Sequence, residues 1–190
     1  MSIDELADYD FCAHSRQVAE ISALLAESAG YSQEEIVIIK QAALFHDLGK
    51  GDIPAQILNK SGALTPEEYE LVKTHTTLGY DKIIKVIDAL SAAAVVCRDH
   101  HECPDGSGYG SGVKDEGIHP YSNIVAAADV FDALYSERPY KEPWDTGKIK
   151  EFFQTRSGTQ FDAEVVKLLL SNIENIKCLY KRQESDFIGR

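Results

Sequence analysis

The chain has 190 residues, 44% of them hydrophobic, so it can bury a sizeable core and most economically forms one domain. Its formal net charge of −12 argues against binding to a nucleic-acid polymer or an anionic membrane, because both need clustered Lys and Arg. The longest apolar run, residues 92–97, is far too short to span a bilayer. The acidic start lacks the basic and apolar regions of a signal peptide. We therefore predict a soluble, cytoplasmic protein.

The first predicted helix covers residues 4–29, where apolar side chains recur with helical spacing up to Gly30. Within it, Asp10 and His14 are four residues apart and share one face, so both can reach the same ion. Taken alone, the pair is better explained as a surface carboxylate paired with a half-buried histidine.

A capping box at Ser32–Glu35 opens the second predicted helix, residues 36–48, which carries His46 and Asp47 near its end. Neighbouring residues on a helix point about 100° apart. Both side chains can therefore enter one cavity only if that cavity lies over the helix end. An aspartate there can bridge two cations with its two oxygens.

The third histidine site is expected at a helix break. Thr65-Pro66-Glu67-Glu68 has the pattern of an N-cap, a proline at the first helical position and a capping box. The helix that follows reaches His75 among three threonines, which weaken a helix, so we predict a kink that turns His75 inward. Helices are then expected over residues 78–87 and 89–99, the second central and almost wholly apolar.

That central helix leads into His100 and His101, followed by a loop rich in glycine and proline, which predicts a site at a helix end covered by the loop. Further on, a strongly apolar helix over residues 122–134 contains Asp129, with Asp132 three residues later on the same side. A buried carboxylate needs a partner, and a metal ion is the most economical one. The tail predicts two more helices, including an amphipathic, structural one over residues 165–176.

No sustained period-two alternation predicts strands, so the expected fold is all-α: a single-domain helical bundle over residues 1–190 with a metal cluster in its centre. Five of the six histidines lie at helix ends or breaks alongside Asp47 and Asp129. Imidazole and carboxylate ligands without thiolates suit Fe, Mn or Zn.

The ordered set of motifs over about residues 10–166 resembles the HD superfamily of metal-dependent phosphohydrolases, and specifically its HD-GYP branch. Residues 46–50 are similar to the family's H-D-x-G-K, and residues 100–109 to its H-H-E-x-x-D-G-x-G-Y-P. Residues 128–141 resemble A-D-V-F-D-A-L…R-P-Y-K, and residues 158–162 match G-x-x-F-D. Each motif alone is weak, but the ordered set is highly specific.

The resemblance implies a phosphodiesterase that hydrolyses cyclic di-GMP to pGpG or GMP with a hydroxide bridging two Fe or Mn ions. Asp47 and Lys50 are the implied catalytic residues, Lys50 acting near the scissile phosphate. The implied metal ligands are His14, His46, Asp47, His75, His100, His101 and Asp129. The implied substrate contacts are Lys50, Gly108, Tyr109, Asp132, Arg138 and Lys141.

Two positions depart from the family pattern. Gly110 stands where the family has the proline of Gly-Tyr-Pro, and Asp10 stands where members with a third metal ion have a glutamate. Two ions are therefore the expectation, with a third involving Asp10 as the alternative.

Two other functions remain open: a phosphohydrolase acting on another nucleotide or a phosphomonoester, and a non-catalytic module that binds cyclic dinucleotides. A second copy of the chain or a regulatory protein acting in trans are the protein partners to consider.

Overall fold

The computed structural model describes residues 12–86, 91–137 and 142–188, with side chains described up to residue 181. Within these ranges the chain is helical, and the only β-type pairing is an isolated bridge between Ser157 and Phe161. The helices are α2 (Ala13–Ser28), α3 (Gln33–Leu44), α4 (Ala55–Leu58), α5 (Pro66–Lys73), α6 (His75–Ile83), α7 (Ala92–Asp99), α8 (Pro120–Tyr135), α9 (Thr146–Thr155), α10 (Ala163–Ser171) and α11 (Ile173–Ile188), with 3₁₀ turns η1 (Leu48–Asp52) and η2 (Asp115–Gly117). The all-α prediction is confirmed. None of the described helices is both long and apolar enough to cross a membrane.

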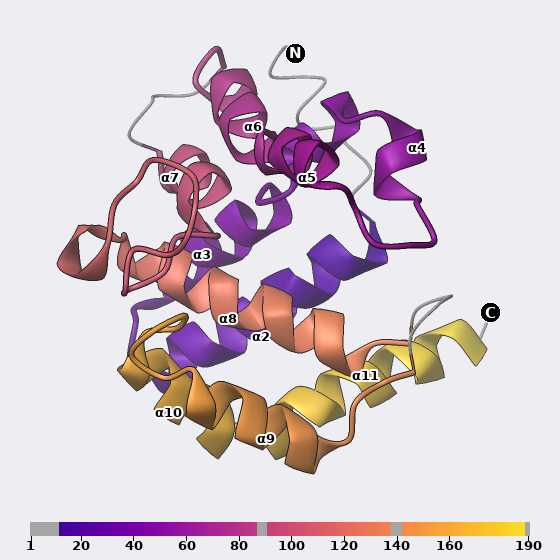
Figure 1. The fold of residues 1–190 in the computed structure, drawn as a ribbon. Coiled ribbons are helices and arrows are strands. Elements are labelled where there is room, and N and C mark those ends of the chain that lie inside the picture. The colour runs from indigo at the N-terminus through magenta and orange to yellow at the C-terminus, as the bar shows by residue number, and fades with distance from the viewer. Residues whose placement is uncertain (1–11, 87–90, 138–141, 189–190) are drawn as a thin grey trace.

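Helices α2, α3 and α8 run through the middle of the molecule, with α4–α7 on one side and α9–α11 on the other (Figure 1). The main core lies where the middle helices meet α9, α10 and α11, around fully buried side chains such as Phe131 and Phe153. A second, smaller cluster joins η1, α6 and α7 through Leu48, Ile83 and Cys97. The turn after α3 therefore lies between two packed regions.

Several predicted helix starts and ends are confirmed. Ser32 and Thr65 each form a full capping box, with Glu35 and Glu68 respectively, which satisfies backbone N–H groups that a helix start leaves unpaired. Gly30 adopts a φ of +83°, the left-handed conformation that lets the chain leave α2.

Two predicted boundaries are wrong. The second helix ends at Leu44 rather than Leu48, because the chain turns at residues 45–47 and continues as η1. The amphipathic segment over residues 165–176 is not one helix: it divides at Asn172 into α10 and α11. Residues 4–11 of the first predicted helix lie outside the described ranges.

The predicted break at His75 is present, because Thr74 both ends α5 and precedes α6. Gly49 of η1 lies directly against this break. A Cβ atom added to Gly49 would lie 1.9 Å from the carbonyl oxygen of His75 and 2.6 Å from the backbone nitrogen of Gly79. Only glycine permits this backbone approach, which brings the turn carrying Asp47 next to His75.

Candidate metal centre

Six imidazole and carboxylate side chains from several elements meet Asp47 in the interior. Their ligand atoms form two groups, within each of which all atoms lie within 4.8 Å of one another. One group contains Asp47, His75, His100 and His101, and the other contains His14, His46 and Asp129. All seven predicted ligands in the described part of the chain are thus brought together, by α2, the turn after α3, α6, the end of α7, and α8.

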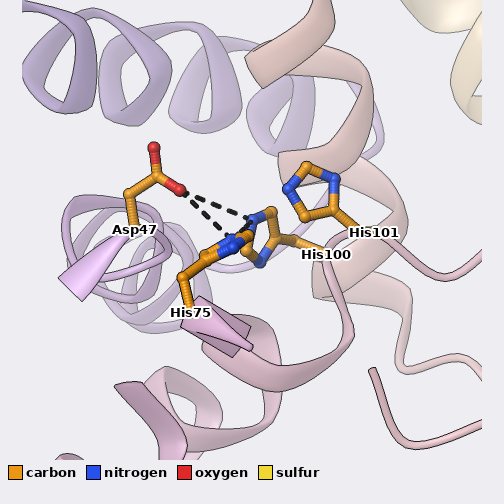
Figure 2. Close-up of side chains that lie close together, drawn as sticks. All are labelled: Asp47, His75, His100 and His101. Atoms are coloured by element: carbon orange, nitrogen blue, oxygen red, sulfur yellow. Dashed lines mark hydrogen bonds and ion pairs between the residues drawn. The ribbon is translucent and has the colours of Figure 1, made fainter. Parts of the chain in front are cut away.

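Asp47 lies between the two groups and faces each with a different oxygen. Its Oδ1 is 3.5 Å from Nε2 of His75 and 3.9 Å from Nε2 of His100, and Figure 2 shows the carboxylate directed at these rings. Its Oδ2 is 3.2 Å from Nε2 of His46 and 4.0 Å from Nε2 of His14. This geometry allows one carboxylate to contact two neighbouring cations.

Backbone hydrogen bonds orient three of the histidines. Nδ1 of His46 lies 2.7 Å from the carbonyl oxygen of Ala43, and Nδ1 of His75 lies 2.7 Å from that of Val72. Nδ1 of His100 lies 3.1 Å from the carbonyl oxygen of Val96. Because a carbonyl can only accept, each Nδ1 carries the proton and each Nε2 is left as a ligand atom directed at the centre.

The centre fits a divalent cation better than it fits internal hydrogen bonding. The Nε2 atoms of His75 and His100 lie 3.5 Å apart, although both are unprotonated acceptors when Nδ1 donates. Nε2 of His46 and Oδ1 of Asp47 are buried without a hydrogen-bond partner among the described residues. Such orphaned buried atoms are costly, and a metal ion satisfies them.

Burial sets the ionisation of three of the imidazole ligands. It lowers the pKa of His75, lowers that of His100 well below its usual value, and lowers that of His101 to about 4, so these imidazoles are neutral at neutral pH. Burial alone would raise the pKa of Asp47 and Asp129, but the neighbouring histidines outweigh it and the pKa of each carboxyl is lowered. Neutral imidazoles and ionised carboxylates are the forms that bind metal.

His14 and His46 differ from the other imidazole ligands in their carboxylate neighbours. Burial works to lower the pKa of His46, but Asp47 and Asp129 outweigh burial and raise it. Burial also works to lower the pKa of His14, but hydrogen bonds to Asp129 and Asp132 outweigh burial and raise the pKa to about 10. Its Nε2 lies 3.0 Å from Oδ1 of Asp129, and its Nδ1 lies 2.6 Å from Oδ2 of Asp132.

The predicted substrate contact by Asp132 is not supported. Its side chain is 3% exposed. Oδ2 is taken by His14, and Oδ1 accepts hydrogen bonds from the hydroxyls of Ser136 and Tyr180, both at 2.8 Å. With both oxygens occupied inside the protein, Asp132 orients His14 instead of facing a substrate.

Lys50 lies at the edge of the centre, where its Nζ is 2.6 Å from Oδ2 of Asp47 and its side chain is 40% exposed. It is therefore a cation within reach of both the ligand cluster and solvent. Of the other predicted residues, Asp10, Arg138 and Lys141 lie outside the described ranges.

The loop after His101 folds back over the end of α7, as predicted. The ring of Tyr109 stacks on that of His101, with centroids 4.7 Å apart, and the backbone N–H of Tyr109 donates to the carbonyl of His101. A Cβ atom on Gly108 would lie 2.4 Å from that same oxygen. Gly108 and Tyr109 thus form a wall beside the ligands.

Gly110, the departure from Gly-Tyr-Pro, has a φ of +142°, and a Cβ atom there would lie 2.2 Å from the carbonyl oxygen of Arg98. Proline is fixed near φ −65° and cannot adopt this conformation. The loop of this chain therefore requires the glycine.

Sequence reasoning missed Ser136 and Tyr180. Tyr180 lies 48 residues after Asp132 and outside every motif, so no local pattern connected the two.

Comparisons with known proteins agree with this geometry. Residues 1–165 match a protein family described as "HD domain". A Thermotoga maritima protein named cyclic di-GMP phosphodiesterase is 38% identical over 186 residues, which cover 97% of this chain and 50% of that protein. A Vibrio cholerae protein named 3'3'-cGAMP-specific phosphodiesterase 2 is 36% identical over 161 residues, which cover 84% of this chain and 31% of that protein.

A solved structure also shares the fold. The Bdellovibrio bacteriovorus protein Bd1817, described as an HDG"Y"P protein, superposes with a TM-score of 0.69 at 19% identity, covering 85% of this chain and 51% of that one. The chain spans about half the length, or less, of the curated relatives described above.

Proposed function

The chain belongs to the HD domain family, and we propose that it is a metal-dependent phosphodiesterase that hydrolyses cyclic di-GMP. The observation that carries the proposal is Asp47, whose two oxygens face two separate groups of imidazole ligands. The name of the Thermotoga relative, which this chain matches along almost its whole length, supports the choice of substrate.

The proposed centre holds two ions, Fe or Mn, with Zn as the alternative. His75, His100 and His101 would hold one ion, His14, His46 and Asp129 the other, and Asp47 would contact both. A third ion would require Asp10. When bound, such ions stabilise charge on a phosphate and activate water for attack near neutral pH.

The remaining chemistry falls to side chains around the cluster. Lys50 is placed to stabilise negative charge on the phosphate or to give a proton to the leaving oxygen. Gly108 and Tyr109 would form the wall against which the substrate lies, and Arg138 and Lys141 would hold phosphate oxygens.

The test is an assay of protein purified without oxygen and loaded with iron or manganese. We expect cyclic di-GMP to be converted to pGpG or GMP, and the same protein stripped of metal to be inactive. A metal-loaded protein that leaves cyclic di-GMP intact would contradict the proposal.

A second candidate substrate is 3'3'-cGAMP, because a relative of 36% identity is named for it. Running both cyclic dinucleotides and a panel of phosphomonoesters in parallel separates the alternatives by their kcat/KM. Activity on a monoester alone would favour a different phosphohydrolase. Tight binding of a cyclic dinucleotide without turnover, in protein shown to contain metal, would identify a binding module.

A further inference from the structure

The side chain of Tyr180 on the C-terminal helix connects to the candidate metal centre through a chain of hydrogen bonds. Its hydroxyl lies 2.8 Å from Oδ1 of Asp132, whose Oδ2 lies 2.6 Å from Nδ1 of His14. On the other side of the ring, Nε2 of His14 lies 3.0 Å from Oδ1 of Asp129. A residue of α11 is therefore two hydrogen bonds away from a ligand ring.

This arrangement replaces the local one used by three of the other ligand histidines. His46, His75 and His100 are oriented by carbonyl groups three or four residues earlier in the chain. His14 is the second residue of α2, and its Nδ1 partner is a carboxylate 118 residues later. Its orientation therefore depends on how α8 and α11 hold that carboxylate.

Asp132 is held from two directions. Ser136, one turn further along the chain, and Tyr180 both donate hydroxyl hydrogens to Oδ1. Burial, together with the charge of Asp132, raises the pKa of Tyr180, so its hydroxyl keeps the proton that it donates. With Oδ1 fixed, Oδ2 remains directed at Nδ1 of His14.

We propose that Tyr180 is a positioning residue of the metal centre: with Ser136 it fixes Asp132, which holds His14 with Nδ1 protonated and Nε2 presented to the ion. Carboxylates bonded to the outer nitrogen of a ligating histidine commonly contribute 10–100-fold to metal affinity. The inference rests on the proposed metal centre. It adds to that centre a helix that begins after residue 165, where the family match ends.

The substitution Tyr180→Phe isolates the hydroxyl. The ring of Tyr180 packs edge-on against that of Tyr135 with centroids 4.7 Å apart, and phenylalanine keeps this contact. Tyr135→Phe is the matched control, because Tyr135 meets Tyr180 through its ring, whereas the hydroxyls that donate to Asp132 are those of Ser136 and Tyr180.

The experiment is a titration of metal-free protein with manganese in the absence of nucleotide. Binding is monitored by calorimetry or by the spectroscopic signal of free manganese. The relevant binding step is the one lost in His14→Ala. We expect Asp132→Asn to weaken this step about 10–100-fold. Losing one of the two hydroxyl hydrogen bonds in Tyr180→Phe should weaken it about 3–10-fold, and Tyr135→Phe should change it less than about twofold.

A double variant distinguishes positioning from general support of the fold. If Tyr180 acts through Asp132, Tyr180→Phe should cause little further loss in an Asp132→Asn background, since groups in one network are not additive. The inference would be overturned if folded Tyr180→Phe bound manganese with wild-type affinity. It would also be overturned if Tyr180→Phe reduced manganese affinity equally in the wild-type and Asp132→Asn backgrounds. If Tyr180→Phe fails to fold, Ser136→Ala takes its place with the same expected loss and the same overturning results.

The result of the manganese titration can be told apart from the result of the activity assay that tests the proposed function. Wild-type protein that binds manganese but does not hydrolyse a cyclic dinucleotide would refute the proposed function and leave this inference standing. If the wild-type protein is active and Tyr180→Phe binds manganese as tightly as wild type, the proposed function would stand and this inference would be refuted.

Discussion

The two sides of the candidate centre are built differently. On the side of His75 and His100, the outer ring nitrogens bond to backbone carbonyls of the preceding turn, so each orientation is set by its own short segment. On the side of His14, the outer nitrogen bonds to Asp132, which is held in turn by Tyr180. The first side is specified locally. On the second side His46 is also held by its own turn, but His14 is oriented only when α2, α8 and α11 have packed together.

The difference indicates how each side should respond to mutation. Backbone carbonyls cannot be removed by a side-chain substitution. The orientation of His75 and His100 therefore changes only if the backbone of their turns moves. The orientation of His14 on the second side relies on hydroxyl and carboxylate groups that single substitutions remove. Asp47 joins the sides, and its loss should affect both.

The largest expected effect is that of Asp47→Ala. The variant should lose both ions and activity together, because among the described residues Asp47 is the carboxylate whose two oxygens face both groups. Metal catalysis supplies several kcal/mol, so activity should fall by about 10³-fold or more. Metal content per chain and the phosphodiesterase assay measure the two losses. Retention of one full equivalent of metal would show that the two sides are independent.

The next effect is that of Gly49→Ala, which tests the locally built side through its backbone. A Cβ atom there would meet the carbonyl of His75 at 1.9 Å, so either η1 or α6 must move. We expect a loss of about 1–3 kcal/mol in the free energy of unfolding, measured with urea, and weaker metal binding. Gly51→Ala, in the same turn with no atom within 4 Å of the added carbon, is the control. Equal effects of the two substitutions would contradict the packing argument.

Lys50→Ala should separate chemistry from metal binding. Lys50 contacts Asp47 but offers no ligand atom to either group, so the variant should keep its metal. Removing one charge that stabilises the transition state typically costs about 10²–10³-fold in kcat. Steady-state kinetics and metal analysis of the same preparation check this, and loss of metal would overturn the role assigned to Lys50.

The smallest effect is expected at the start of α5, which contributes no ligand atom to either group. Thr65→Ala removes the capping box of α5 and should cost about 1 kcal/mol of stability, seen as a lower urea midpoint. Metal content and kcat should stay unchanged. A change in either would mean that the start of α5 helps to position Val72, whose carbonyl orients His75.

Much of the fold and the ligand set could be predicted from the sequence. Capping boxes, the helix break at His75 and the glycine-rich loop are signals within a few residues, because they depend on local backbone hydrogen bonding. The motif order placed His46, Asp47, His100 and His101 at helix ends, where the structure has them. Gly110 was recognised as a departure, but only its φ and its contact with Arg98 explain the glycine.

The tertiary structure alone decided what joins these pieces. Asp132 and Tyr180 lie 48 residues apart, and no periodicity within a helix reports a hydrogen bond between two helices. For the same reason Asp132 was expected to face a substrate and instead supports His14. The sequence by itself determined which side chains could bind metal, because that is a property of residue type and local turns. Packing decided which atoms of those side chains face the centre and what holds them there.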